Sequence, residues 1–145
     1  MSETVNFSLT VSSVIDNLDD FGLTGGDPEI NSLTTVGELT VKCGFMKLTF
    51  SEISESGEII STMFIKDSEV RLYKRGAIDV DMRFSRGECE KTIYRIGPYA
   101  FDMEIKTKSI KQNLDQYGGE LTLVYAMNIG GQDKNVRMTI TAKRK

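Results

Sequence analysis

Apolar and polar residues alternate along most of this chain. In residues 5–11, VNFSLTV, every odd position is apolar and every even position is polar, and the same rhythm returns in residues 99–105, 121–129 and 136–140. Ten stretches between residues 5 and 143 follow it, whereas few place apolar residues three or four positions apart. A pleated strand turns successive side chains to opposite faces, so this period predicts strands with one buried and one solvent-facing side.

Turn-forming residues separate these stretches, mostly at intervals of about 8–14 residues, which is typical of an all-β sandwich or barrel built from antiparallel hairpins. The segment 109–117, SIKQNLDQY, has helical spacing, but it lies between two strong strands and is expected to be strand or irregular. We therefore expect residues 1–145 to form a single all-β domain, a sandwich or barrel of antiparallel hairpins with little helix. The turns are marked by Gly44, Ser56-Gly57, Asp67-Ser68, Arg75-Gly76, Arg86-Gly87, Gly97-Pro98, Gly118-Gly119 and Gly130-Gly131.

Residues 71–87, RLYKRGAIDVDMRFSRG, are predicted to form one of these hairpins. A three-residue loop at 74–76 would place Leu72 opposite Ile78 and keep both in the core, whereas a two-residue loop would turn one strand inside out. Such a loop needs a left-handed residue at its end, and Gly76 supplies it without a Cβ clash.

The same hairpin contains five basic and two acidic residues. In the predicted register Arg71 faces Asp79, a cross-strand ion pair worth about 0.2–1 kcal/mol. The charges then mainly form a solvated face of the hairpin. The alternative is an anion-binding site formed by Arg75, Arg83 and Arg86.

Size and composition are those of one ordinary globular domain. A chain of 145 residues can bury roughly 68–70% of the surface that its unfolded form exposes. Apolar residues make up 39% and charged residues 27%, which favours a thin, two-sided core. Residues 1–41 contain seven acids and no base, so the remaining residues, with 18 bases and 14 acids, are basic.

The chain contains no histidine, which excludes His-assisted nucleophiles and His-ligated zinc. Asp79 and Asp81 share a strand face, but their parity predicts that they face water. Cys43 and Cys89 have no metal-ligand spacing and are expected to be small buried hydrophobic residues. We therefore expect no enzyme activity, no catalytic residues, no cofactor and no metal.

An acidic loop is expected at residues 16–29, DNLDDFGLTGGDPE. Its carboxylates are suitable calcium ligands, but the spacing does not fit an EF-hand, because Leu18 and Phe21 occupy the third position and the glycine position. A surface loop is the favoured interpretation.

No run of eighteen apolar residues is present, and the N-terminus lacks a basic region followed by an apolar stretch, so a cytoplasmic location without membrane contact is expected. A sequence pI near 5.1, and the lack of Lys or Arg interleaved with aromatic residues, argue against nucleic acid as a partner.

Four segments in order, at residues 73–84, 106–115, 119–131 and 135–140, resemble the YwiB-like proteins, small bacterial β-barrels of the calycin type. The resemblance covers nearly the whole chain and implies a lipocalin-like, closed antiparallel barrel. We therefore expect a single antiparallel barrel of about eight to ten strands. It implies no reaction, because that family is one of unknown function. The chain also has no Trp, so it lacks the Gly-X-Trp motif of true lipocalins.

A barrel interior is the favoured place for a site, because a closed sheet of this size has room for side chains or one small ligand. The parities that face inward include Tyr99, Met103, Tyr125, Met127 and Met138, which either fill the core or bind a small, mostly apolar molecule in the lumen. The alternative function is a protein-interaction or structural module whose partner is another protein or a second copy of the chain in a homodimer.

Overall fold

The computed structural model describes residues 3–18 and 26–144, and these contain ten β-strands and no helix. The prediction of an all-β chain is therefore confirmed. Within the same residues, no helix is long and apolar enough to cross a membrane. The strands are β1 (Glu3–Asn17), β2 (Glu29–Lys42), β3 (Phe45–Ser54), β4 (Gly57–Ile65), β5 (Glu69–Gly76), β6 (Ile78–Ser85), β7 (Cys89–Ile96), β8 (Tyr99–Gln112), β9 (Gly118–Ile129) and β10 (Gln132–Arg144).

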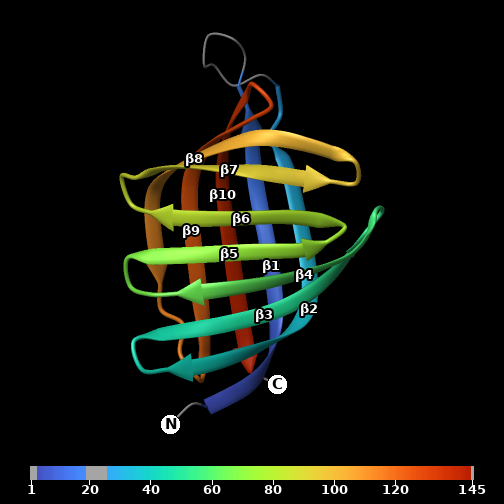
Figure 1. The fold of residues 1–145 in the computed structure, drawn as a ribbon. Helices are drawn as coiled ribbons and strands as arrows, with labels where there is room; N and C mark the ends of the chain where they lie inside the picture. The colour runs from blue at the N-terminus through green and yellow to red at the C-terminus, as the bar shows by residue number, and fades with distance from the viewer. Residues whose placement is uncertain (1–2, 19–25, 145) are drawn as a thin grey trace.

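The ten strands close into one antiparallel barrel in the order β1-β10-β9-β8-β7-β6-β5-β4-β3-β2 (Figure 1). Every strand pairs with its sequence neighbour, and β1 closes the sheet by pairing with β10 from Phe7–Arg144 to Asn17–Lys134. The predicted closed antiparallel barrel is thus confirmed, at the upper end of the predicted number of strands. Segment 109–117 is strand to Gln112 and irregular beyond it.

The period of two seen in the sequence is the alternation of core and solvent in the barrel. On β6 the burial pattern alternates strictly from Asp79 to Phe84. Apolar side chains of the inner faces form one cluster, in which Phe7, Leu9 and Leu123 are completely buried. Each such side chain contributes roughly 1.5–3 kcal/mol by leaving water.

The predicted register of the β5–β6 hairpin is wrong by four residues. Leu72 lies opposite Met82 rather than Ile78, and Arg71 lies opposite Arg83, so the predicted pair with Asp79 does not form. Because the register is shifted by an even number of residues, each side chain still lies on the face of the sheet that was predicted for it.

The hairpin cannot turn where the sequence suggested, because β5 remains paired with β4 through Gly76 and Ile59. The Ala77 N–H then donates to the Glu58 carbonyl at 2.9 Å, which extends this contact past the end of β5. Gly76 has the expected positive φ, 116°, and the Glu58 carbonyl occupies the place of a Cβ. A glycine is therefore required at this position by the close approach of β4, and not by the conformation of a short loop.

Both cysteines are exposed, so the prediction that they are buried is wrong. Cys43 lies in the turn after β2, and Cys89 begins β7 at the barrel surface. In the acidic loop, Asp19 and Asp20 lie outside the described residues, so the calcium interpretation is not tested there.

The hydrogen-bonded ladder is short between two pairs of strands. β2 and β3 pair only from Gly37–Phe50 to Lys42–Phe45, although both strands continue beyond Gly37 and Phe50. β6 and β7 share only two pairs, Ile78–Ile96 and Asp79–Arg95. These two short ladders position the openings described next.

Candidate functional site

A cavity of about 480 Å³ opens where β2 and β3 separate. We call it the mouth. Its walls come from β1 to β6 and β10, and they combine inward-facing apolar side chains with a few polar groups. The lining residues are Val11, Ser13, Asn31, Ser32, Leu33, Phe50, Glu52, Ile53, Ser54, Ile59, Met63, Leu72, Lys74, Ile78, Met138 and Ile140.

The two strands separate next to a close contact at Gly37. This residue is buried, and the Leu9 side chain occupies the place where a Cβ would lie. Just beyond the last ladder pair, the Thr35 hydroxyl donates to the Ser51 carbonyl at 2.9 Å. From there β2 follows β1, while β3 runs with β4 into a hairpin that projects from the barrel (Figure 1).

An ion pair lies on the inner side of the mouth. Glu52 follows Leu48 and Phe50 on the inner face of β3, and Lys74 follows Leu72 on the inner face of β5. The Lys74 Nζ lies 3.5 Å from the Glu52 Oε1, and the two side chains are 27% and 25% exposed. The sequence analysis did not predict this pair. The sequence does contain a signal for it, because a charged residue stands two positions after the last apolar residue on the inner face of each strand.

The negative charge of Glu52 also affects the hydroxyl of Tyr94 on β7. It is on the less exposed face of its strand and packs against the core. Burial raises the pKa of its hydroxyl, and the negative charge of Glu52 raises it further. Tyr94 is therefore a protonated hydrogen-bond donor over the physiological range rather than a base.

Ser61 is the polar residue beneath the ion pair. It lies on the inner face of β4 between Ile59 and Met63, with Phe50 and Lys74 as its cross-strand neighbours. It is fully buried, and among the described residues its hydroxyl has no hydrogen-bond partner. An unpartnered buried hydroxyl is unfavourable for folding, so the barrel contains, next to Lys74 and Phe50 of the mouth, a polar atom that the fold itself does not use.

The five predicted lumen residues do not gather in one place. Met138 lines the mouth, whereas Met103 and Tyr125 are part of the packed core. The Tyr125 ring lies 4.8 Å from the Phe84 ring, and burial raises the pKa of its hydroxyl. Met127 packs at the edge of the core and lines a separate surface pocket.

Tyr99 is 65% exposed, so the prediction that it faces the lumen is wrong. Its parity on β8 matches that of Met103, but the β8–β9 ladder begins only at Met103. Tyr99 pairs with Ile96 in the β7–β8 hairpin, which projects beyond the barrel, so no opposite wall covers it (Figure 1). Alternation in the sequence shows which face of a strand a side chain occupies. It does not show where along that strand the barrel ends.

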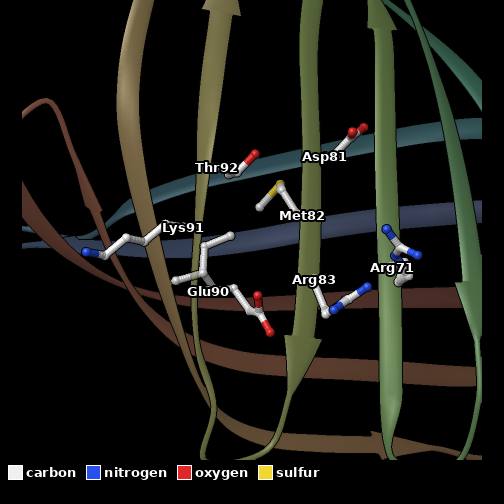
Figure 2. A pocket seen from close by; sticks show the side chains of 8 residues that line it. Arg71, Asp81, Met82, Arg83, Glu90, Lys91 and Thr92 are labelled. Carbon is white, nitrogen blue, oxygen red and sulfur yellow. The ribbon is translucent and has the colours of Figure 1, made fainter.

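A second, smaller opening of about 150 Å³ lies where β6 and β7 continue beyond their short ladder without pairing, and we call it the seam. Figure 2 shows its side chains on β5, β6 and β7. The seam is lined by residues of both faces of the barrel wall, so the wall itself is interrupted there. They are Arg71, Asp81, Arg83 and Lys91 from the outer face, and Met82, Glu90, Thr92 and Ile105 from the inner face.

The three predicted anion-binding arginines do not form a free cluster at the seam. Arg75 donates to Asp81 at 2.6 Å, and Arg83 lies 3.2 Å from Glu69. Arg86 lies in the turn after β6 and does not line the seam. Two of the three charges are thus already partnered, and anion binding stays a prediction.

Acidic and thiol groups do not assemble elsewhere in the described chain. In residues 3–18 and 26–144 there is no group of three or more His, Cys, Asp or Glu side chains that could hold a metal ion. Cys89 Sγ lies 2.9 Å from Glu104 Oε1, and this hydrogen bond raises the pKa of the thiol.

The closed antiparallel sheet, packed at its centre and open at its side, defines a small all-β barrel protein. The chain belongs to the family described as Domain of unknown function (DUF1934), whose model matches residues 23–140. It is 28% identical to the uncharacterized beta-barrel protein YwiB of Bacillus subtilis (strain 168). The alignment spans 142 residues and covers 97% of this chain and 95% of that protein. The crystal structure of the ywiB protein from Bacillus subtilis matches with a TM-score of 0.85 and 27% identity, over 98% of this chain and 93% of that one. The resemblance noted from the sequence is confirmed.

Proposed function

We propose that this barrel binds a small, mostly apolar molecule in the mouth between β2 and β3. The observation that carries the proposal is a cavity of about 480 Å³ that connects solvent with inward-facing core residues such as Met63, Leu72 and Met138. Small-molecule sites typically measure about 300–1,000 Å³ and combine an apolar lining with a few polar groups. The mouth has both properties.

The proposal is binding rather than catalysis. The chain has no histidine, and among the described residues that line the mouth the ionisable groups are one carboxylate, Glu52, and one amine, Lys74. Glu52 and Lys74 are paired with each other, and the pKa of Tyr94 is raised, which opposes its use as a base near neutral pH. These groups are suited to orienting a bound molecule.

Fluorescence titration with the apolar dye N-phenyl-naphthylamine tests the proposal. Leu33 lines the mouth and Val36 lies on the opposite face of the same strand, 49% exposed. We expect the dye to bind the natural protein and Leu33→Trp to weaken its binding roughly tenfold or more by filling the cavity, with no change in Val36→Trp. Equal binding by both variants, or no binding by the natural protein, would contradict the proposal.

Native mass spectrometry of freshly isolated protein complements this titration. A mass increment that Leu33→Trp loses and Val36→Trp keeps would identify a resident ligand of the mouth. An increment kept by both variants would place that ligand elsewhere and count against the proposal.

A protein-interaction role is the second candidate. β2 has no β3 partner from Glu29 to Val36, and Ile30 on this segment is 70% exposed. An unpaired strand edge can accept a strand from another chain, including a second copy. A monomeric mass in solution, together with recovery of no partner from cell extract, would count against this role.

A further inference from the structure

The polar groups in the mouth restrict the chemistry of its ligand. Among the described residues that line it, Glu52 and Lys74 are the only ones that carry charge, and both side chains are about three-quarters buried. Resting on the proposed function, we infer that the ligand is an amphiphile whose head group has no net charge and both donates and accepts hydrogen bonds. An alcohol, an amide or a zwitterion has such a head.

A head group with a single charge would disrupt the ion pair. A carboxylate drawn to the Lys74 ammonium would come close to the Glu52 carboxylate, and an ammonium drawn to Glu52 would come close to Lys74. The two protein charges are only 3.5 Å apart, so the ligand cannot approach one without meeting the other. A bound ligand also excludes water from the mouth, so a charge left without its partner there costs more free energy than in the open, solvent-screened mouth.

A head group that donates and accepts can bind both residues at once. The distance of 3.5 Å exceeds the roughly 2.7–2.9 Å of a strong charge-assisted hydrogen bond, so both groups keep capacity for a further partner. Lys74 carries three donors and Glu52 offers acceptor lone pairs on two oxygens. A hydroxyl or amide placed beside the pair accepts from Lys74 and donates to Glu52, while its alkyl chain lies against Leu72, Met63 and Met138.

The apolar part of the mouth matches an alkyl chain. Several of the residues that line the cavity are buried apolar side chains, among them Met63, Leu72 and Met138. Methionine side chains adapt to irregular apolar shapes and therefore select for hydrophobicity rather than for one precise outline. The head group is then the part of the ligand on which specificity depends.

A matched set of ten-carbon ligands tests the inference by displacement of N-phenyl-naphthylamine at about neutral pH. The set is decanol, decanamide, 2-aminodecanoic acid (whose head is a zwitterion), decanoic acid and decylamine. We expect the first three to bind roughly tenfold tighter than the last two, which carry one net charge. Equal or tighter binding of decanoic acid or decylamine would overturn the inference.

Variants of the pair give an independent result. Glu52→Gln leaves Lys74 unpaired and should tighten decanoic acid roughly tenfold, whereas Lys74→Gln should tighten decylamine by a similar factor. Lys47→Gln, on the outer face of β3, is the matched control and should change neither. No gain for either charged ligand in its variant would overturn the inference.

A charge exchange covers the case in which a single variant fails to fold. Glu52→Lys combined with Lys74→Glu restores an ion pair and should keep the preference for uncharged and zwitterionic heads. A switch of this double variant to a singly charged ligand would contradict the inference. Failure of every ligand and of the dye to bind the natural protein would instead contradict the proposed function.

Discussion

Glu52 of β3 reaches Lys74 of β5 across the intervening strand β4, on the inner face of the barrel. Beneath them on β4 lies the unpartnered hydroxyl of Ser61. Three polar residues therefore occupy consecutive strands at positions where the period of two calls for apolar side chains. They mark the point at which the barrel changes from a packed core to an open mouth.

Breaking the ion pair should destabilise the fold only slightly. Both side chains are about a quarter exposed, so solvent screens their attraction. We expect a double-mutant cycle of Glu52→Gln and Lys74→Met, measured by urea unfolding, to give a coupling energy of about 0.5–1 kcal/mol. A coupling well above this range would mean that the pair holds the fold together rather than shaping the site.

Removing the Ser61 hydroxyl should stabilise the protein. Ser61→Ala deletes a buried polar atom that has no partner, and we expect about 1 kcal/mol of added stability. Thr107→Val is the matched contrast, because the Thr107 hydroxyl accepts a hydrogen bond from the Ser85 N–H at 3.1 Å and is equally buried. That variant should lose about 1–3 kcal/mol in the same unfolding experiment. Destabilisation by Ser61→Ala would show that the hydroxyl has a partner.

Gly37→Ala should destabilise the barrel by about 1–3 kcal/mol, because the new methyl group collides with the Leu9 side chain. Shortening Leu9 to Val removes the closest contact of that methyl group, although the Thr49 carbonyl, 3.0 Å from the place of the new methyl group, stays. The double variant should therefore be less destabilised than the sum of the two single variants, as measured by thermal or urea unfolding. Simple additivity would show that the strand at Gly37 can shift away from Leu9.

Stability should fall as the pH rises above about 10. Burial raises the pKa of both Tyr94 and Tyr125 above the value of an unfolded tyrosine. Their contribution is fully present below the unfolded pKa, and it is lost above it because the unfolded chain releases these protons more readily. Tyr94→Phe should make the loss between neutral and alkaline pH shallower, and an unchanged slope would contradict this assignment.

The Cys89 thiol should react slowly with alkylating reagents near neutral pH. Its hydrogen bond to Glu104 raises the thiol pKa, and the thiolate is the reactive form. Glu104→Gln removes the negative charge and should accelerate alkylation of Cys89, while the rate at Cys43 serves as the internal reference. Equal acceleration at both thiols would point to a general change of structure.

Alternation and turns predicted the strands and their antiparallel hairpins, because both are local in the chain. Closure of the sheet joins β1 to β10 at the two ends of the chain, and it was predicted from the resemblance to the YwiB-like proteins. The β5–β6 register was not predictable in the same way, since it depends on how long β5 stays paired with β4 up to Gly76. Tyr99 was misplaced because alternation does not show where the barrel ends. The Glu52–Lys74 pair could have been found as a charge on each apolar face, but its contact across β4 required the fold.

The central claim is that the mouth between β2 and β3 holds an amphiphile with its head at Glu52 and Lys74. A crystal structure of the protein with decanol brominated at the end of its chain tests it most directly, because anomalous scattering locates the bromine atom. We predict a bromine peak at the inner end of the mouth beside Leu72 and Met138. A bromine peak only outside the mouth, in crystals soaked at concentrations that displace the dye in solution, would contradict the account.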